Sequence, residues 1–339
     1  MTTQASSDLH IHFETRATKP AVFKMTEAGI ASAKSRSALP EVRTSLGHDL
    51  KDLSWLEHAV GLVTSNDLIG DPKFPLRGLA AAAPRLCWIH VIAAGIEPLL
   101  PLDWLPKHVV LTNNSGVHFE KTRESATMAL LMLNAHLPTI ATNQRAARWD
   151  QIFTPLIAGK VALVIGLGDM GAAVAKAAKQ LRLRVIGVRR THLTPHSDVD
   201  EMVSIDTLDA VLPEADFVAL ATPLTPETRN LLDRRRIGLM KSGAGFLNIG
   251  RAACADYGAL SEALQSGALS GAVLDVYDAE PLPTSSPLWR ADNLFLIPHV
   301  TSDDPEHYLP KTFDLVFANA ARFLGGESLV NVVDPQRGY

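Results

Sequence analysis

One stretch of the chain, residues 161–171, constrains the fold more than any other. It reads Val-Ala-Leu-Val-Ile-Gly-Leu-Gly-Asp-Met-Gly, and an alanine-rich run follows at residues 172–179. Five consecutive apolar residues predict a strand buried on both faces of a parallel sheet, and the alanine-rich run predicts a helix. Gly166, Gly168 and Gly171 have the spacing that permits a tight turn, close approach of the backbone to a pyrophosphate, and close helix–strand packing. The helix N-terminus adds N–H groups and partial positive charge for phosphates. The stretch therefore predicts a dinucleotide-binding unit.

The next strand of this unit, predicted over residues 183–188, is followed by Arg189, Arg190 and Thr191. Arg189 lies eighteen residues beyond Gly171, where an acidic residue usually binds the ribose 2′-hydroxyl of NAD(H). An arginine at that position can instead bind a 2′-phosphate through charge-assisted hydrogen bonds. The alternative is a solvated charge pair at a strand end. The sequence thus predicts NADP(H) as the preferred cofactor, with NAD(H) as the other possibility.

Further apolar runs alternate with helical stretches along the rest of the chain. Strands are expected at residues 9–13, 59–64, 86–92, 109–112, 216–220, 246–249, 272–276 and 294–297, and helices at 79–83, 119–149 and 310–324. This alternation predicts an α/β fold with two Rossmann-like domains. One is a doubly wound parallel sheet that binds the dinucleotide, over residues 117–302. The other is a smaller, flavodoxin-like, discontinuous substrate domain, formed by residues 1–116 and 303–339.

The composition excludes several classes of protein. With 47% hydrophobic residues, 20% charged residues and a net charge of −4, the chain lacks the basic footprint of a nucleic-acid binder. No apolar run is long enough to span a membrane. Only Cys87 and Cys254 are present, which favours a reducing cytoplasm. His10 and His12 share one face of a strand, but no third ligand is evident nearby, so no metal is expected.

Three polar residues follow predicted strands, where ligands of doubly wound sheets bind. Arg251, Glu280 and His299 occur in the contexts Asn-Ile-Gly-Arg, Asp-Val-Tyr-Asp-Ala-Glu-Pro and Ile-Pro-His. Each alone is compatible with an ordinary loop charge. Together they suit reduction of a 2-oxo acid, in which arginine binds the substrate carboxylate and polarises the carbonyl while histidine donates a proton as hydride arrives. A glutamate hydrogen-bonded to the imidazole favours its protonated form and fixes its orientation.

These motifs resemble those of the D-isomer-specific 2-hydroxyacid dehydrogenases over residues 88–339, and the pair Arg189-Arg190 resembles the NADP(H)-preferring glyoxylate and hydroxypyruvate reductases of that family. The loop at 93–95, the signature at 223–228 and the ending at 331–334 also match. The resemblance implies that Arg251, Glu280 and His299 are catalytic. It implies that the substrate-binding residues are Ala94, Gly95, Arg251 and His299. It also implies that the cofactor-binding residues are Gly166, Gly168, Asp169, Met170, Gly171, Arg189, Arg190, Thr191, Thr222, Pro223, Thr228, Ile249, Gly250 and Asp275.

The resemblance further implies a homodimer through the long apolar pattern at 119–149. The leading interpretation is an NADPH-dependent oxidoreductase that reduces a small 2-oxo acid, such as glyoxylate or hydroxypyruvate, to the D-2-hydroxy acid. The alternative is a nucleotide-sensing scaffold, because the family includes transcriptional corepressors that keep the fold and much of the site. The absence of long interaction tails and the presence of Arg189 favour the enzyme.

Overall fold

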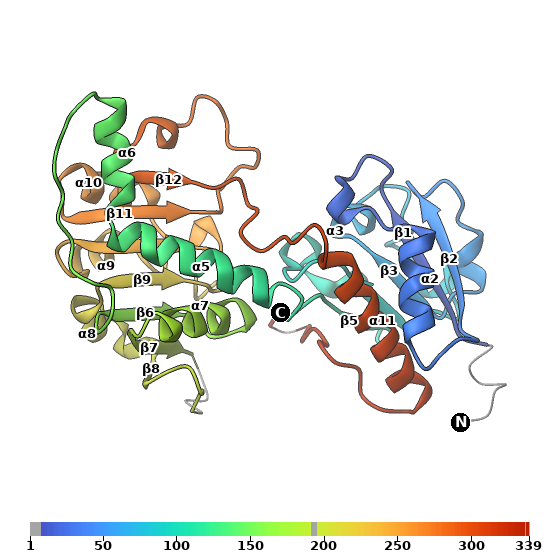
Figure 1. The fold of residues 1–339 in the computed structure, drawn as a ribbon. Helices are drawn as coiled ribbons and strands as arrows, with labels where there is room; N and C mark the ends of the chain where they lie inside the picture. Colours follow the sequence, from blue (N-terminus) through green and yellow to red (C-terminus); the bar gives the residue numbers. More distant parts are fainter. Residues whose placement is uncertain (1–7, 191–194, 336, 339) are drawn as a thin grey trace. The chain divides into compact units, whose positions relative to one another are not determined.

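A computed structural model describes residues 8–190, 195–335 and 337–338 (Figure 1). The chain divides into two compact units. Unit 1 contains the described residues up to Val117 and from Asp304 onward, and unit 2 is His118–Asp303. Each unit is built on one sheet whose strands all pair in parallel. The predicted α/β class with two parallel sheets is therefore confirmed.

Unit 1 has a five-stranded sheet in the order β2-β1-β3-β4-β5, which is the flavodoxin-like order. Its strands are β1 (His10–Thr15), β2 (Arg43–His48), β3 (Gly61–Thr64), β4 (Trp88–Val91) and β5 (Val110–Thr112). Its helices are α2 (Glu27–Arg36), α3 (Asn66–Ile69), α4 (Leu79–Ala82) and α11 (Tyr308–Leu324), with 3-10 turns η1 (Ala21–Phe23), η2 (Ser54–Glu57), η3 (Glu97–Leu99) and η4 (Leu102–Trp104). The C-terminal helix α11 packs against α2 and buries Phe313, Val316 and Phe317 in a core shared with β1.

Unit 2 has a seven-stranded sheet in the order β12-β11-β10-β9-β6-β7-β8. Its strands are β6 (Val161–Ile165), β7 (Arg184–Arg189), β8 (Glu201–Ser204), β9 (Phe217–Leu220), β10 (Ala244–Asn248), β11 (Leu269–Leu274) and β12 (Leu294–Leu296). Its helices are α5 (Phe119–Asn134), α6 (Leu137–Arg145), α7 (Asp169–Gln180), α8 (Leu208–Val211), α9 (Arg234–Leu239) and α10 (Tyr257–Gln265), with 3-10 turns η5 (Ile205–Thr207), η6 (Leu212–Glu214), η7 (Ala252–Cys254) and η8 (Pro287–Arg290).

Helices cover both faces of this second sheet. The central strand β6 places Leu163 and Ile165 in one apolar core, and Ala162 and Val164 in the other. The strand order reverses between β7 and β9, which flank β6 on either side. In a doubly wound sheet that reversal is where a ligand binds, beyond the carboxyl ends of the strands. The fold therefore places the glycine-rich loop, which follows β6, at the expected ligand position.

The prediction of a single helix over residues 119–149 is wrong. The structure has α5 ending at Asn134 and α6 beginning at Leu137, separated by His136 in a left-handed conformation (φ 54°). Pro138 lies in the first turn of α6, where a missing N–H is tolerated but a continuous helix is not. Helix α6 ends at Arg145, and residues 148–156 have no regular secondary structure.

Two strands, β2 and β8, were not expected from the sequence. Both are edge strands, and most of their side chains are only partly buried, so they lack an apolar run.

Within the described ranges, no helix combines the length and apolar character needed to cross a bilayer.

Candidate functional site

The glycine-rich loop joins β6 to α7, and its three glycines have different environments. Gly166 has φ 90°, and a Cβ there would lie 2.9 Å from the carbonyl oxygen of Ala221. A Cβ on Gly171 would lie 1.8 Å from the carbonyl oxygen of Gly166. Gly168, which caps α7, would meet no atom within 4 Å. The protein's own backbone thus requires the outer two glycines, whereas Gly168 borders open space at a helix N-terminus that suits a pyrophosphate.

Polar groups beside this loop fit a dinucleotide. Thr222 follows β9, and its Oγ1 is buried without a hydrogen-bond partner among the described residues. A buried hydroxyl usually has a partner, so this atom is available to a ligand. Gly250 allows close packing here, since a Cβ would lie 2.7 Å from the Thr222 carbonyl oxygen. The Thr228 hydroxyl instead donates to the Pro223 carbonyl at 2.7 Å and so stabilises the loop 223–228. Ile249 is buried in the core.

Arg189 ends β7 beside the glycine-rich loop. Its Nη2 donates a hydrogen bond to the carbonyl oxygen of Leu167, between the first two glycines. Arg190 forms an ion pair with Glu227, with 3.6 Å between Nη1 and Oε2. Thr191 lies outside the described residues. One guanidinium is therefore fixed next to the predicted phosphate-binding turn.

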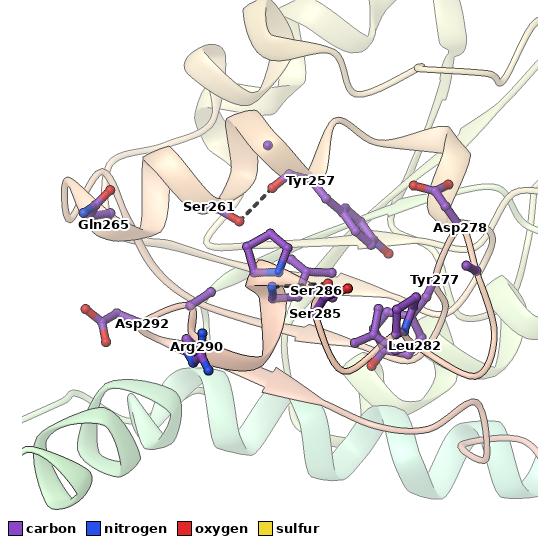
Figure 2. A pocket seen from close by; sticks show the side chains of 16 residues that line it. Tyr257, Ser261, Gln265, Tyr277, Asp278, Leu282, Ser285, Ser286, Arg290 and Asp292 are labelled. Carbon is purple, nitrogen blue, oxygen red and sulfur yellow. Dashed lines mark hydrogen bonds between the residues drawn. The ribbon is translucent and has the colours of Figure 1, made fainter.

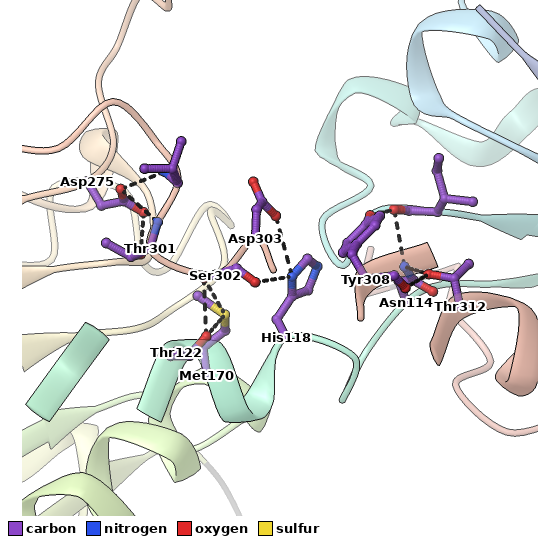
Figure 3. Close-up of polar contacts among 12 residues, drawn as sticks. Asn114, His118, Thr122, Met170, Asp275, Thr301, Ser302, Asp303, Tyr308 and Thr312 are labelled. Atoms are coloured by element: carbon purple, nitrogen blue, oxygen red, sulfur yellow. Dashed lines mark hydrogen bonds and ion pairs between the residues drawn. The ribbon is translucent and has the colours of Figure 1, made fainter. Parts of the chain in front are cut away.

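The start of α7 also contacts other parts of unit 2. Asp169 and Met170 are its first two residues. The Met170 Sδ accepts hydrogen bonds from the hydroxyls of Thr122, at 3.4 Å, and Ser302, at 3.5 Å (Figure 3). These contacts tie the glycine-rich turn to the beginning of α5 and to the segment that follows His299.

Arg251, Glu280 and His299 follow β10, β11 and β12, which are parallel neighbours at one edge of the sheet. His299 Nδ1 lies 2.7 Å from Glu280 Oε2, and their side chains are 49% and 35% exposed. The other carboxylate oxygen of Glu280 accepts the Tyr277 N–H at 2.9 Å. Arg251 Nη1 donates to the Gly250 carbonyl at 2.8 Å. The structure thus places Glu280 and His299 in direct contact, with Arg251 at the adjacent strand end.

The backbone of His299 is held in the left-handed region, with φ 53°. Such a conformation is uncommon for a residue other than glycine and persists only where neighbouring contacts fix it. Here the His299 N–H donates to the Ile297 carbonyl at 2.9 Å. The buried carboxylate of Asp275 accepts the N–H groups of Val300 and Thr301, at 3.0 and 3.3 Å, and the Thr301 hydroxyl (Figure 3). Burial raises the pKa of the Asp275 carboxyl, and the hydrogen bonds from Thr301 and Val300 oppose that rise.

In unit 1, Ala94 and Gly95 follow β4 in a loop anchored by asparagine side chains. Asn113 Nδ2 donates to the Ala94 carbonyl at 2.8 Å, and Asn66 Nδ2 donates to the Gly95 carbonyl at 2.9 Å. These bonds fix the backbone that is predicted to bind a carboxylate. His90, on β4 itself, is fully buried, and its burial lowers its pKa to about 4. A neutral, enclosed imidazole of this kind has a packing role.

His10 and His12 also lie in unit 1, on β1. Both rings are within hydrogen-bond distance of the Ser45 hydroxyl, at 2.7 and 2.8 Å. His12 Nε2 lies 3.0 Å from Glu14 Oε2. Among the residues that the structure describes, no group of three or more His, Cys, Asp or Glu side chains is arranged to hold a metal ion.

Sequence reasoning missed three residues that connect the strand ends: Asn248, Tyr257 and Tyr277. Asn248 Oδ1 accepts the Gly250 N–H at 2.9 Å, and both tyrosine hydroxyls bond to carbonyls near the ends of β11 and β12. A signal was present for two of them, because Asn248 begins the motif that contains Arg251 and Tyr277 lies within the motif that contains Glu280.

Comparison with known proteins agrees with this fold. The family model described as D-isomer specific 2-hydroxyacid dehydrogenase, NAD binding domain, matches residues 127–301. The chain is 31% identical to glyoxylate reductase of Korarchaeum cryptofilum, over 75% of this chain and 78% of that protein. It is 30% identical to glyoxylate/hydroxypyruvate reductase B of Pectobacterium carotovorum, over 83% of this chain and 89% of that protein.

Solved structures show the same fold over almost the whole chain. A D-isomer specific 2-hydroxyacid dehydrogenase from Xanthobacter autotrophicus Py2, in complex with NADPH and MES, has a TM-score of 0.80 and 28% identity, covering 98% of this chain and 99% of that one. A probable 2-hydroxyacid dehydrogenase from Rhizobium etli CFN 42, in complex with NADP, HEPES and L(+)-tartaric acid, has a TM-score of 0.77 and 25% identity, covering 98% and 100%. The chain therefore belongs to the D-isomer specific 2-hydroxyacid dehydrogenase family and is an NAD(P)-dependent oxidoreductase.

Proposed function

We propose that this protein reduces a small 2-oxo acid to the D-2-hydroxy acid with NADPH. The observation that carries the proposal is the 2.7 Å contact between His299 Nδ1 and Glu280 Oε2, in the same unit and beyond the same sheet as the glycine-rich loop. A dyad at that position suits proton transfer coupled to hydride transfer. The relatives named glyoxylate reductase and glyoxylate/hydroxypyruvate reductase support glyoxylate or hydroxypyruvate as the substrate.

The residues act in the following way in this proposal. The reduced nicotinamide, when bound, supplies hydride to the substrate carbonyl carbon. Because Nδ1 of His299 is hydrogen-bonded to Glu280, Nε2 is the nitrogen that donates a proton to the carbonyl oxygen. Glu280 holds the imidazole in that orientation and favours its protonated form. Arg251 binds the substrate carboxylate and polarises the carbonyl. The backbone of Ala94 and Gly95, in unit 1, is the other group proposed to bind substrate.

The preference for NADPH rests on Arg189. Its guanidinium lies beside the glycine-rich turn at the end of β7, where an acidic residue usually binds the ribose diol. A 2′-phosphate carries nearly two negative charges, so an arginine binds it and an acid repels it. The neighbouring structures from Xanthobacter autotrophicus and Rhizobium etli contain NADPH and NADP, which supports this choice.

We also propose that the substrate domain comprises residues 1–116 and 303–339 and that the dinucleotide domain comprises residues 117–302. The compact units of the structure support this division, with boundaries within one or two residues of those positions. The glycine-rich loop, Arg189 and the Glu280–His299 pair all belong to unit 2.

A homodimer formed through unit 2 is part of the same proposal. The segment after α6 carries Trp149, Phe153 and Leu156 with side chains 91%, 87% and 85% exposed, and Met128 and Leu131 on α5 are also exposed. Large apolar side chains are rarely left in water together on a monomer. A second copy of the chain would cover them.

We also propose that the protein is cytoplasmic. A chain with only two cysteines suits a reducing compartment, and cell fractionation checks this location.

The test of the function is an absorbance assay with purified protein, NADPH and glyoxylate or hydroxypyruvate. The proposal predicts oxidation of NADPH that depends on the 2-oxo acid. Tight NADPH binding without turnover of any small 2-oxo acid would instead support the nucleotide-sensing scaffold.

A further inference from the structure

Tyr277 contacts Glu280 directly and the backbone beside His299, through different parts of the residue. Its backbone N–H donates to Glu280 Oε1 at 2.9 Å. Its phenol oxygen lies 2.8 Å from the carbonyl oxygen of Leu274, at the end of β11, and 2.8 Å from that of Ile297, just after β12. The single hydroxyl proton is donated to one carbonyl at a time. Tyr277 therefore connects the two strand ends that precede Glu280 and His299.

The Ile297 carbonyl links this contact directly to the histidine. It also accepts the N–H of His299, at 2.9 Å, within the turn that holds His299 at φ 53°. A hydroxyl that fixes the position of this carbonyl also fixes the acceptor for the His299 N–H. The phenol thus helps to define the left-handed conformation from which the imidazole reaches Glu280.

Tyr257 makes the corresponding connection for the arginine. Its hydroxyl donates to the Val276 carbonyl at 2.9 Å and accepts a hydrogen bond from Asn248 Nδ2 at 2.9 Å. Asn248 Nδ2 also donates to the carbonyl of Arg251 at 3.1 Å, and its Oδ1 accepts the N–H of Gly250. Tyr257 therefore joins the turn that carries Arg251 to the end of β11.

The loop that carries Glu280 borders a pocket. The pocket has a volume of about 640 Å³ and is lined by residues of α10 and of the segment 277–292, with both tyrosines among them (Figure 2). Hydrogen bonds from the two phenols hold the backbone at this pocket. Burial raises the pKa of both phenols, which keeps them protonated as hydrogen-bond donors near neutral pH.

We propose that the hydroxyls of Tyr277 and Tyr257 are positioning groups for the reaction, Tyr277 for the Glu280–His299 pair and Tyr257 for the Arg251 turn. This inference rests on the proposed reductase function and adds residues to its site. Neither tyrosine has to touch the substrate or the cofactor. Each acts by fixing the backbone next to a residue that does.

The Tyr277 hydroxyl has a consequence for proton transfer. It helps to fix the Ile297 carbonyl, which accepts the N–H of His299, and His299 Nδ1 lies 2.7 Å from Glu280. The backbone N–H of Tyr277 that bonds to Glu280 does not depend on this hydroxyl. Loss of the hydroxyl therefore loosens the placement of the proton donor, and proton transfer becomes slower.

The test is Tyr277→Phe in the full-length protein, which removes only the hydroxyl. Loss of one hydrogen bond predicts a decrease in kcat of roughly three- to tenfold. The KM for the 2-oxo acid and the Kd for NADPH remain near wild type, because the groups that bind substrate and cofactor are unchanged. The kcat is expressed per NADPH-binding site, so a low yield of folded variant does not mimic the effect. Tyr257→Phe predicts the opposite split, a higher KM for the 2-oxo acid with a kcat near wild type.

Ser286→Ala is the matched control. Ser286 lines the same cavity, but its hydroxyl accepts the N–H of Leu288 at the start of η8 and does not bond to a strand end (Figure 2). The control should keep wild-type kcat and KM. A wild-type kcat in Tyr277→Phe, or an equal decrease of kcat in Ser286→Ala, would overturn the inference.

A second readout separates this inference from the proposed function. The NMR chemical shift of the His299 ring, with the resonance assigned from His299→Asn, is measured without turnover. If the wild-type protein fails to reduce 2-oxo acids, the function is wrong. The positioning role of Tyr277 is then supported by a changed chemical shift of that resonance in Tyr277→Phe and overturned by an unchanged one.

Discussion

At position 189 a guanidinium stands at the strand end where an acidic side chain would repel a 2′-phosphate. Charge-assisted hydrogen bonds contribute on the order of 1.5–3 kcal/mol each before solvent losses. One or two of them predict a preference for NADPH over NADH of about tenfold to a few hundredfold in kcat/KM. Arg189→Asp should abolish or invert this ratio, mainly through KM, because the phosphate is remote from the reacting carbon.

The matched control for that substitution is Arg184→Asp. Arg184 begins the same strand, β7, and pairs with Glu201 and Glu214 on the surface. Arg184→Asp should leave the ratio of kcat/KM for NADPH to that for NADH unchanged. Equal efficiency of the unmutated protein with NADPH and NADH would show that Arg189 does not contact the cofactor.

His299 is the residue on which turnover should depend most strongly. Removing a general acid typically lowers a rate by about 10²–10⁴, so His299→Ala should reduce kcat by that factor. The NADPH affinity of His299→Ala should remain near wild type, since the His299 side chain contacts Glu280 and not the glycine-rich loop. His58→Ala, at an exposed histidine in unit 1, is the control and should be fully active. High residual turnover in His299→Ala would assign the acid role to another group.

At the scale of elements, the strand–loop–helix from β6 to α7 was predictable because its constraints are local. A short apolar run and three spaced glycines determine it without reference to distant residues. The break between α5 and α6 was not predicted, because the Ala and Leu periodicity continues across His136. Pro138 was a local signal for that break. Strand β2 was missed because an edge strand with half-exposed side chains has no apolar pattern.

The candidate site, like the fold, was predictable from the sequence only in part. That Arg251, Glu280 and His299 follow strands was evident from the motifs, and parallel neighbours place them at one edge. The contact between Glu280 and His299 follows from the pairing of β11 with β12. The bonds from Tyr277 depend on the direction of a phenol across two loops, which no local pattern encodes.

The glycine-rich loop permits a test that separates folding from ligand binding. Gly171→Ala places a Cβ 1.8 Å from the Gly166 carbonyl oxygen, so the loop or α7 has to move. We expect a destabilisation of roughly 1–3 kcal/mol, measured as a lower Tm. Gly168→Ala meets no protein atom within 4 Å and should fold normally, with NADPH binding at least tenfold weaker. Wild-type cofactor affinity in Gly168→Ala would show that the pyrophosphate binds elsewhere.

At the scale of the whole molecule, the proposed homodimer rests on the exposed apolar segment after α6. Trp149, Phe153 and Leu156 together offer a large apolar surface, and burying each is worth roughly 1.5–3 kcal/mol. Light scattering at micromolar concentration should show a dimer. Replacing all three by serine should produce a monomer. Trp289→Ser, at another exposed aromatic residue, should remain dimeric. A wild-type monomer would contradict the proposed assembly.

The product formed from hydroxypyruvate and NADPH tests the proposed reductase activity most directly. Chiral chromatography of the reaction, together with the absorbance of NADPH, gives both the identity and the stoichiometry of the product. We predict one molecule of the D-2-hydroxy acid, D-glycerate, for each NADPH oxidised, and none with His299→Ala on the same timescale. Absence of NADPH oxidation with both hydroxypyruvate and glyoxylate would contradict the proposed reductase activity. Formation of the L-isomer would contradict the proposed D-2-hydroxy acid product.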